Sequence, residues 1–313
     1  MKNASFLFLC CILLMVIIIS ITTFNQIATE PIQMNSIYTI NILNSKDKTV
    51  LKMPLEEYVW RVAAKEMPIS FHDEAFKAQI VVARTYALRK ICSNAHEDNI
   101  DVCTDHNHCT AFLLPGDEAS QFSSNHKSSV ERLQSLTLST EELIITHDKQ
   151  PILAVFHATS SGITEKSSDI WQAQLPYLIN VESSVDEKAH GFNSQKSFSE
   201  KELKEIFGVK SPITFHNIIL TDAGSVKSIT IGDKKYSGTE IRNLLGLRSN
   251  NFTIQKNEDI YTFLVKGYGH GVGMSQTGAN ILAEQGYTYR EILQKYYPGT
   301  EIKTLSDLSI PTK

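Results

Sequence analysis

The chain has 313 residues, of which 42% are hydrophobic and 20% are charged, and its formal net charge at neutral pH is −4. These values are typical of a globular protein that buries one large core or two modest cores. A mildly acidic chain without a basic stripe is a poor match for a phosphate backbone, so we expect no nucleic acid partner.

The N-terminal segment departs from this average composition. Residues 6–24 contain no charged residue and are long enough to cross a hydrocarbon layer of ~30 Å as a helix. Lys2 precedes this run, and the charge asymmetry places the N-terminus in the cytoplasm and the bulk of the chain outside. A cleaved signal peptide is the alternative, but its apolar core would be shorter and would end in small residues. We therefore expect a cytoplasmic tail at 1–5, a retained anchor at 6–24 and a tether at 25–36.

The next part of the chain predicts a hairpin followed by two helices. Alternating apolar residues favour strands at 37–43 and 48–52. Apolar residues at helical spacing then predict a helix over 55–66, which Pro68 ends because proline restricts the residue before it. A second helix is expected over 73–91.

The remaining segments alternate between irregular, strand and helix patterns. Residues 92–128 are expected to form an insertion or long loop, and 182–200 a linker or exposed loop. The other expected elements are strands at 151–157, 214–220, 226–231 and 261–265, a helix opened by Thr239 and a helix opened by the capping box of Thr288 and Glu291.

This order of elements predicts a mixed α+β fold. We expect one extracytoplasmic domain over 37–305, divided into lobes at about 37–180 and 181–305 with a cleft between them, and preceded by the single transmembrane helix.

Glu66 stands where the helical pattern calls for an apolar side chain. The stripe Leu55, Tyr58, Val59, Val62 and Ala63 follows one helix face, and Glu66 is its next member. A carboxyl group on the buried side of a helix end loses hydration, which raises its pKa and lets it donate a proton near neutral pH. The alternative is a helix-terminal glutamate that turns out to water.

The densest group of glycines lies at 267–279. Glycine lets a backbone approach a ligand closely or adopt a positive φ, and Ser275 is expected to cap the helix that follows. A phosphate cradle is disfavoured because the lysine of a P-loop is missing. A structural turn that lines a groove is the favoured interpretation.

A second cluster contains His96, Cys103, His106, His108 and Cys109. Thiolate and imidazole ligands of this density suit Zn²⁺, which takes four such ligands. A Cys103–Cys109 disulfide is the alternative, since an extracytoplasmic position permits it.

Two nucleophile candidates are weaker. A serine hydrolase site at His157 and Ser160 lacks the Gly-x-Ser-x-Gly elbow. Cys92 follows a helix end with no assigned base.

Taken together, several segments resemble the SpoIID/LytB family, which comprises stage II sporulation protein D and the LytB-type amidase enhancers. The matching segments, in the family's order, are 58–68 (YVWRVAAKEMP), 74–79 (EAFKAQ), 83–87 (ARTYA), 156–165 (FHATSSGITE), 237–240 (SGTE) and 269–276 (GHGVGMSQ).

The resemblance implies a membrane-anchored lytic transglycosylase, an enzyme that cuts peptidoglycan glycan strands to 1,6-anhydro-muramic ends during endospore engulfment. It implies a location at the septum between mother cell and forespore, with other engulfment membrane proteins as partners. The implied substrate is glycan from which the amidase stage II sporulation protein P has removed the stem peptides. The alternative is a non-catalytic wall-binding activator of an N-acetylmuramoyl-L-alanine amidase, as the enhancer members are. A metal-dependent hydrolase at the Cys/His cluster is a third, weaker hypothesis.

The same resemblance assigns roles to residues. Glu66 is implied to be the catalytic acid, and Arg84 is implied to support catalysis or the glycan. The residues expected in the substrate groove are Tyr177, His270, Gly271, Ser275, Gln276 and Tyr297.

Some relatives hold zinc with a histidine and a Cys-x4-His-Cys element. This element matches His96, Cys103, His108 and Cys109. The resemblance therefore implies a structural Zn²⁺ and no cofactor for catalysis.

Overall fold

A computed structural model describes Met34, Ser36 and residues 38–93, 99–105, 108–171, 173–210 and 212–308. The chain divides into two compact units, Met1–Met34 and Asn35–Lys313, and every element below belongs to the second. The predicted anchor at 6–24 lies outside the described residues. Among the residues that are described, no helix is long and apolar enough to span a membrane.

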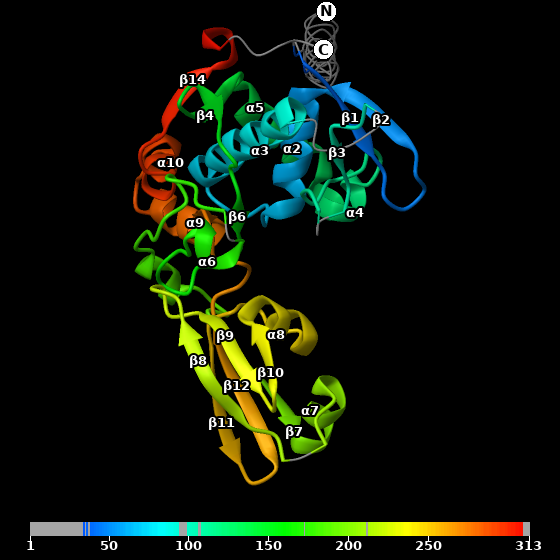
Figure 1. Ribbon diagram of the computed structural model, residues 1–313. Helices are drawn as coiled ribbons and strands as arrows, with labels where there is room; N and C mark the ends of the chain where they lie inside the picture. The colour runs from blue at the N-terminus through cyan, green and yellow to red at the C-terminus, as the bar shows by residue number, and fades with distance from the viewer. Residues whose placement is uncertain are drawn as a thin grey trace, which may run out of the picture. The chain divides into compact units, whose positions relative to one another are not determined.

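The part of this unit that carries Glu66 consists of helices packed with small sheets (Figure 1). Its helices are α2 (Leu55–Glu66), α3 (Asp73–Ser93), α4 (Glu118–Phe122), α5 (His126–Leu138), α9 (Gln276–Glu284) and α10 (Tyr289–Tyr296), with a 3-10 turn η1 (Ser123–Asn125). Its strands are β1 (Thr39–Leu43), β2 (Val50–Pro54), β3 (Val102–Cys103), β4 (Leu143–His147), β5 (Gln150–Pro151) and β14 (Glu301–Thr304), with a 3-10 turn η3 (Leu305–Asp307).

Helix α3 is the central element of this part. It contacts α2, α5, α9, α10 and β4, and most of its residues are buried. The sheets on either side have the orders β2-β1-β3 and β14-β4-β5. Strand β14 pairs with β4 in antiparallel register, which brings the end of the described chain back to its middle.

A short parallel pair joins β6 (Phe156–His157) to β13 (Met274–Ser275). The segments that lie between them in sequence include α6 (Ser167–Ile170) and the 3-10 turn η2 (Ser184–Lys188). The glycine-rich run at 267–279 leads into β13 and then into α9, so it is part of the framework as well as of the surface.

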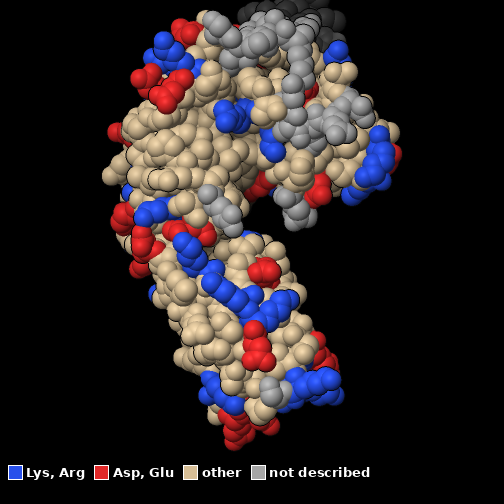
Figure 2. All heavy atoms as spheres, in the orientation of Figure 1, with Lys and Arg blue, Asp and Glu red and all other residues tan. Residues whose placement is uncertain are grey.

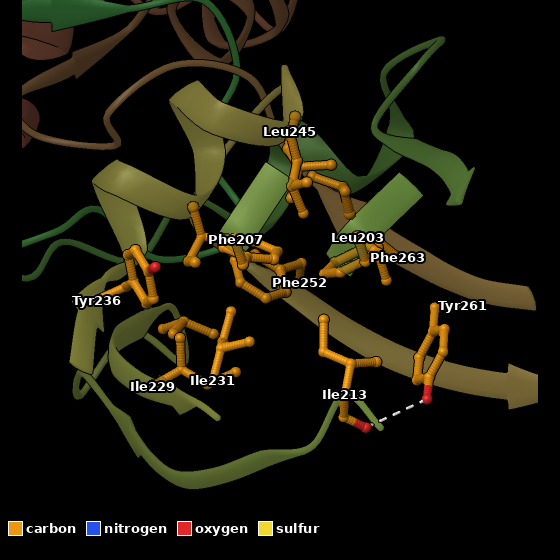
Figure 3. Packing of buried hydrophobic residues seen from close by; sticks show 14 residues of the cluster. Leu203, Phe207, Ile213, Ile229, Ile231, Tyr236, Leu245, Phe252, Tyr261 and Phe263 are labelled. Carbon is orange, nitrogen blue, oxygen red and sulfur yellow. Dashed lines mark hydrogen bonds between the residues drawn. The ribbon is translucent and has the colours of Figure 1, made fainter. Parts of the chain in front are cut away.

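A second group of elements has its own hydrophobic core. It comprises β7 (Asn193–Ser199), α7 (Glu200–Phe207), β8 (Phe215–Leu220), β9 (Val226–Ile231), β10 (Lys234–Ser237), α8 (Gly238–Leu245), β11 (Phe252–Asn257) and β12 (Ile260–Lys266). The strands form two sheets with the orders β10-β9-β8 and β11-β12-β7. Figure 3 shows the aromatic and aliphatic side chains of this core, where the Tyr261 hydroxyl donates a hydrogen bond to the Ile213 carbonyl oxygen at 3.4 Å.

The α+β prediction is confirmed, and so are several elements. The hairpin, the helix ending at Glu66, the second helix and the capping box at Thr288 all appear as expected. Helix α8 begins two residues earlier than expected, because Ser237 rather than Thr239 forms its capping box. The division into lobes with a cleft stays a prediction.

Other expectations were wrong. The supposed linker contains β7, which pairs with β12 along its whole length, so backbone hydrogen bonds order a strand whose side chains are mostly exposed. The supposed loop at 92–128 contains β3, α4 and the start of α5. The strand expected at 151–157 is divided between β5 and β6, with an irregular segment between them.

Charges of both signs are interspersed on the face of the molecule shown in Figure 2. Some are paired across elements: Lys166 pairs with Asp222, and Lys227 lies 2.7 Å from Asp169.

The β6–β13 pairing predicts a strict requirement for glycine at position 273. Gly273 has a φ of +73°, and a Cβ atom there would lie 2.1 Å from the Val155 carbonyl oxygen. Gly286 is a matched control, because its φ is +93° but nothing lies within 4 Å of its Cβ position. Both alanine variants carry backbone strain of about 1–3 kcal/mol, and Gly273→Ala should lose roughly 1–3 kcal/mol more from overpacking. Urea unfolding measures both, and equal losses would contradict the close approach.

Candidate active site

Glu66 is the last residue of α2, and its side chain is half-buried. The chain leaves the helix at Met67 in an extended conformation, with φ −122° and ψ 143°, as expected before a proline. The Glu66 Oε1 atom accepts a hydrogen bond from the Ala111 backbone N–H at 2.7 Å. The carboxyl group is therefore oriented by a backbone donor and does not extend freely into water.

The segment that carries Ala111 lies along α2, from its first turn to its last residue. The Tyr58 hydroxyl is 3.0 Å from Thr110 Oγ1, and the Tyr58 ring stacks on Phe112 with the ring centroids 5.4 Å apart. Further along, the Leu113 N–H donates to the Arg61 carbonyl at 3.3 Å, and the Arg61 guanidinium donates back to the Leu113 carbonyl at 3.3 Å. Contacts on both sides of Ala111 thus hold the donor that orients Glu66.

Cys103, His108 and Cys109 are brought together directly before this segment. The His108 Nδ1 atom lies 3.4 Å from Cys103 Sγ and 3.5 Å from Cys109 Sγ. The three ligand atoms all lie within 4.8 Å of one another, and among the described residues neither cysteine forms a disulfide. Around tetrahedral Zn²⁺, a sulfur and a nitrogen ligand lie about 3.5 Å apart, given bond lengths of about 2.3 and 2.05 Å.

The donor set therefore fits zinc. Burial raises the pKa of the Cys109 thiol to about 12, so a thiolate there requires a compensating cation. The fourth expected ligand, His96, lies outside the described residues, as does His106.

Arg84 is not placed beside Glu66. Its side chain has no exposed surface, and it binds Glu56 in a bidentate manner, with N–O distances of 2.8 and 2.6 Å. Its remaining nitrogen donates to the Leu143 carbonyl at 3.0 Å. Glu56 and Glu66 are separated by ten residues of one helix, or about 15 Å. None of the Arg84 surface is available to a glycan, so direct contact with the polymer is excluded, and its expected support of catalysis stays a prediction that would act through the position of α2.

Most of the expected groove residues are also buried. Tyr177 is 6% exposed and its hydroxyl accepts from the Leu153 N–H, while Tyr297 is 0% exposed and its hydroxyl donates to the Val155 carbonyl at 2.7 Å. Gln276 is 6% exposed, and its amide lies 3.4 Å from that of Gln79. These side chains support the fold and offer little surface to a polymer, and their place in a groove stays a prediction.

Ser275 has a purely structural environment. Its hydroxyl accepts from the Gly278 N–H, which confirms the predicted cap of α9, and it donates to Asp186 at 2.6 Å. Asp186 is fully buried, also accepts from Ser183 at 2.6 Å, and has its pKa raised to about 6 by burial. A Cβ at Gly278 would lie 2.6 Å from Asp186 Oδ2, so this glycine makes room for the network.

His270 and Gly271 are the members of the expected groove that keep partial exposure. The His270 ring packs against exposed Trp171 and against buried His157, with centroid distances of 5.0 and 5.8 Å. The Gly271 carbonyl oxygen accepts a hydrogen bond from the Glu165 N–H at 2.8 Å, and the φ of Gly271 is +79°. This surface is formed by the glycine-rich run and by Trp171, which directly follows α6.

Sequence patterns missed the groups that orient this chemistry. Ala111 acts through its backbone N–H, which no side-chain pattern can reveal. Glu56 was missed because it lies off the apolar stripe of α2, yet it is 1% exposed. The available signal was the position of Glu56, a charged residue directly after the first residue of the predicted helix.

Comparisons with known proteins agree with the motifs of this site. The profile of the Stage II sporulation protein family (SpoIID) matches residues 44–147. The chain is 34% identical to Stage II sporulation protein D of Bacillus subtilis (strain 168) over 269 residues, which cover 84% of this chain and 78% of that protein. It is also 34% identical to Stage II sporulation protein D of Bacillus amyloliquefaciens over 278 residues, covering 87% of this chain and 81% of that protein.

A more distant similarity extends to the Amidase enhancer of Bacillus subtilis (strain 168), with 29% identity over 300 residues that cover 77% of this chain and 39% of that protein. The identity and coverage shared with the sporulation proteins place the present chain: it belongs to the stage II sporulation protein D family.

The buried ion pair of Arg84 and Glu56 predicts a large effect on stability. Arg84→Met leaves Glu56 buried without its partner and should cost about 3–5 kcal/mol. The double variant Glu56→Leu/Arg84→Met should recover much of this loss, because no buried charge remains. Lys303→Gln breaks an exposed pair with Glu301 and should cost less than about 1 kcal/mol. Chemical unfolding measures all three, and an Arg84→Met chain as stable as the Lys303 variant would refute the structural role.

Proposed function

We propose that this chain is a membrane-anchored lytic transglycosylase that cleaves the glycan strands of peptidoglycan and leaves 1,6-anhydro-muramic ends. One observation carries the proposal: Glu66 is half-buried at a helix end and its carboxyl group is oriented by the Ala111 N–H. An acid held in one orientation can stay close to a single glycosidic oxygen, which is the requirement for general acid catalysis.

The proposed reaction uses Glu66 twice. Protonated Glu66 donates its proton to the oxygen that links N-acetylmuramic acid to N-acetylglucosamine, and the bond to the muramic anomeric carbon breaks. The carboxylate then takes the proton of the C6 hydroxyl as that oxygen bonds to the same carbon. The 1,6-anhydro ring closes and Glu66 regains its proton. Because the nucleophile is part of the substrate, no water and no second carboxylate at a fixed separation are needed.

The cellular setting is part of the proposal. The apolar segment at 6–24 would anchor the chain in the cell membrane, with the catalytic domain outside, at the septum between mother cell and forespore. The substrate would be glycan from which the amidase stage II sporulation protein P has removed the stem peptides, and other engulfment membrane proteins would be partners. Membership of a sporulation protein family supports this setting.

Replacing Glu66 tests the enzymatic proposal. Glu66→Gln keeps the size of the side chain but cannot transfer a proton, so cleavage should fall by about 10²–10⁴. Glu284→Gln is the matched control, because Glu284 is also the last residue of its helix but is exposed. Mass spectrometry of peptide-free glycan counts the anhydro-muramic ends. Full cleavage by the Glu66 variant would remove this residue from the reaction.

The alternative function is that of an activator of an amidase that has no catalytic activity of its own. The similarity to the Amidase enhancer supports this alternative. Purified wild-type chain separates the two functions. Anhydro ends formed without any amidase require the enzyme, whereas stimulated amidase activity with no anhydro ends supports the activator.

We also propose that Cys103, His108, Cys109 and His96 bind a structural Zn²⁺. The bound ion would cross-link β3 to the segment that starts at Cys109 and continues through Ala111. The ion would thus help to orient Glu66 and would take part in no chemical step.

Replacing one cysteine tests the zinc proposal. The Cys103→Ser variant should lose bound zinc and unfold at a lower temperature. The unfolding temperature should fall by about 2–4 °C for each kcal/mol by which the free energy of unfolding decreases. Cys92→Ser is the control, because Cys92 is exposed and lies outside the set. Elemental analysis and thermal unfolding give the two readouts. Wild-type protein that binds no zinc would refute the site, and wild-type stability in the Cys103 variant would refute its structural role.

A further inference from the structure

Residues 109–121, called the strap below, start at the Cys–His cluster and run along helix α2. Near its start, the strap presents the Ala111 N–H to the Glu66 carboxyl group at 2.7 Å. At its other end, the Gln121 amide donates to the Ala64 carbonyl at 3.1 Å. The strap is therefore fastened to the last turn of α2 near both of its ends.

One charged side chain of α2 binds the middle of the strap. The Arg61 Nη1 atom donates to the Leu113 carbonyl at 3.3 Å, and its Nη2 atom lies 2.8 Å from Glu118 Oε1. The other Glu118 oxygen accepts from the Gly116 N–H at 2.9 Å. Burial alone would raise the pKa of Glu118, but its hydrogen bonds, including the one from Arg61, lower it on balance. The ionised Glu118 carboxylate thus joins the turn at Gly116 to Arg61.

Arg61 is itself held in place by its own helix. Its Nε atom lies 2.8 Å from Glu57 Oε1, and its guanidinium carbon lies 4.3 Å from the centre of the Trp60 ring. The second Glu57 oxygen accepts from the Trp60 indole N–H at 2.8 Å. Because a planar guanidinium with fixed partners is pre-organised, it loses little further freedom when it binds the strap. Arg61 is 7% exposed, so it offers little surface to a polymer.

We propose that Arg61 is a positioning residue for glycan cleavage: it fixes the strap on α2 and so keeps the Ala111 N–H directed at the Glu66 carboxyl group. The proposal rests on the proposed function for its reaction. General acid catalysis depends on where the acid lies, and a displacement of about 1 Å caused far from the chemistry can cost about 10²-fold in rate. Arg61 therefore governs the rate of turnover and not the binding of glycan.

Two replacements of Arg61 test this role in a folded chain. The side chains of Glu57 and Glu118 are 22% and 21% exposed, so water can hydrate both carboxylates when Arg61→Met removes their partner. Arg61→Lys keeps a positive charge near them but lacks the planar fork. Lys196→Met is the matched control, because Lys196 also packs over an aromatic ring and donates to a backbone carbonyl. It lies on β7, in the group of elements that has its own core.

The first readout is turnover of peptide-free glycan, counted as anhydro-muramic ends at a temperature where every variant is folded. In Arg61→Met, kcat should fall about 10- to 100-fold while KM changes less than about twofold. Arg61→Lys should recover part of kcat, and Lys196→Met should retain all of it. A purely structural role leaves the kcat of the folded protein unchanged. That result, or an increase of KM alone, would overturn the proposal.

The second readout is amide hydrogen exchange, which follows the strap itself. In Arg61→Met the amides of residues 109–121 should exchange faster than in the wild-type chain, while those of α3 keep their protection, because local opening does not require global unfolding. Wild-type exchange rates in the strap would show that Arg61 does not hold it.

The third readout is a double-variant cycle that needs no turnover. Glu66→Ala removes the acceptor of the Ala111 N–H, and release of the strap already breaks this hydrogen bond. The shifts of the urea midpoint in Arg61→Met and Glu66→Ala should therefore sum to more than the shift in the double variant. Lys196→Met and Glu66→Ala should be additive. Additive shifts for the Arg61 pair would disconnect Arg61 from Glu66.

These outcomes separate the positioning role from the proposed function. If the wild-type chain yields no anhydro ends, the transglycosylase is refuted, and the exchange rates and the cycle still decide whether Arg61 orients Glu66. If the wild-type chain and Arg61→Met cleave equally well, the transglycosylase stands and the positioning role is lost.

Discussion

The buried ion pair between Arg84 and Glu56 is the interaction on which the rest of the structure depends. It joins the start of α2 to the middle of α3, and the same guanidinium reaches the Leu143 carbonyl at the beginning of β4. Helix α3 in turn contacts α5, α9 and α10. A buried charge pair tolerates little displacement, because either partner alone would be desolvated without compensation. The pair therefore sets the position of α2, and with it the position of Glu66.

The far end of α2 shows how that position becomes a potential active site. Glu66 is oriented by a backbone N–H from a segment that begins at Cys109, next to the Cys–His cluster. The same segment is held on both sides of Ala111 by contacts with α2. A local cross-link at the cysteines would thus act on the acid through only two residues of backbone. This arrangement separates the group that reacts from the groups that hold it.

The glycine-rich run is structural over much of its length, as its composition suggested. Its glycines let the chain pass against β6, and Ser275 joins a buried network with Asp186. Only part of the run remains at the surface, where His270 packs between Trp171 and His157. The exposed part is the one that can meet a ligand, and the buried part fixes its position.

The sequence by itself determined the local features: the hairpin, the helix that ends before Pro68, the caps at Ser275 and Thr288, and the family. These follow from residue spacing and from proline, serine and threonine at chain positions where their local geometry dominates. Only the tertiary structure decided which polar residues are buried. Arg84 and Tyr297 carry groups that suit a glycan, but packing from segments distant in sequence removes them from solvent. The donor to Glu66 is likewise a backbone group brought in by the fold, and no pattern of side chains encodes it.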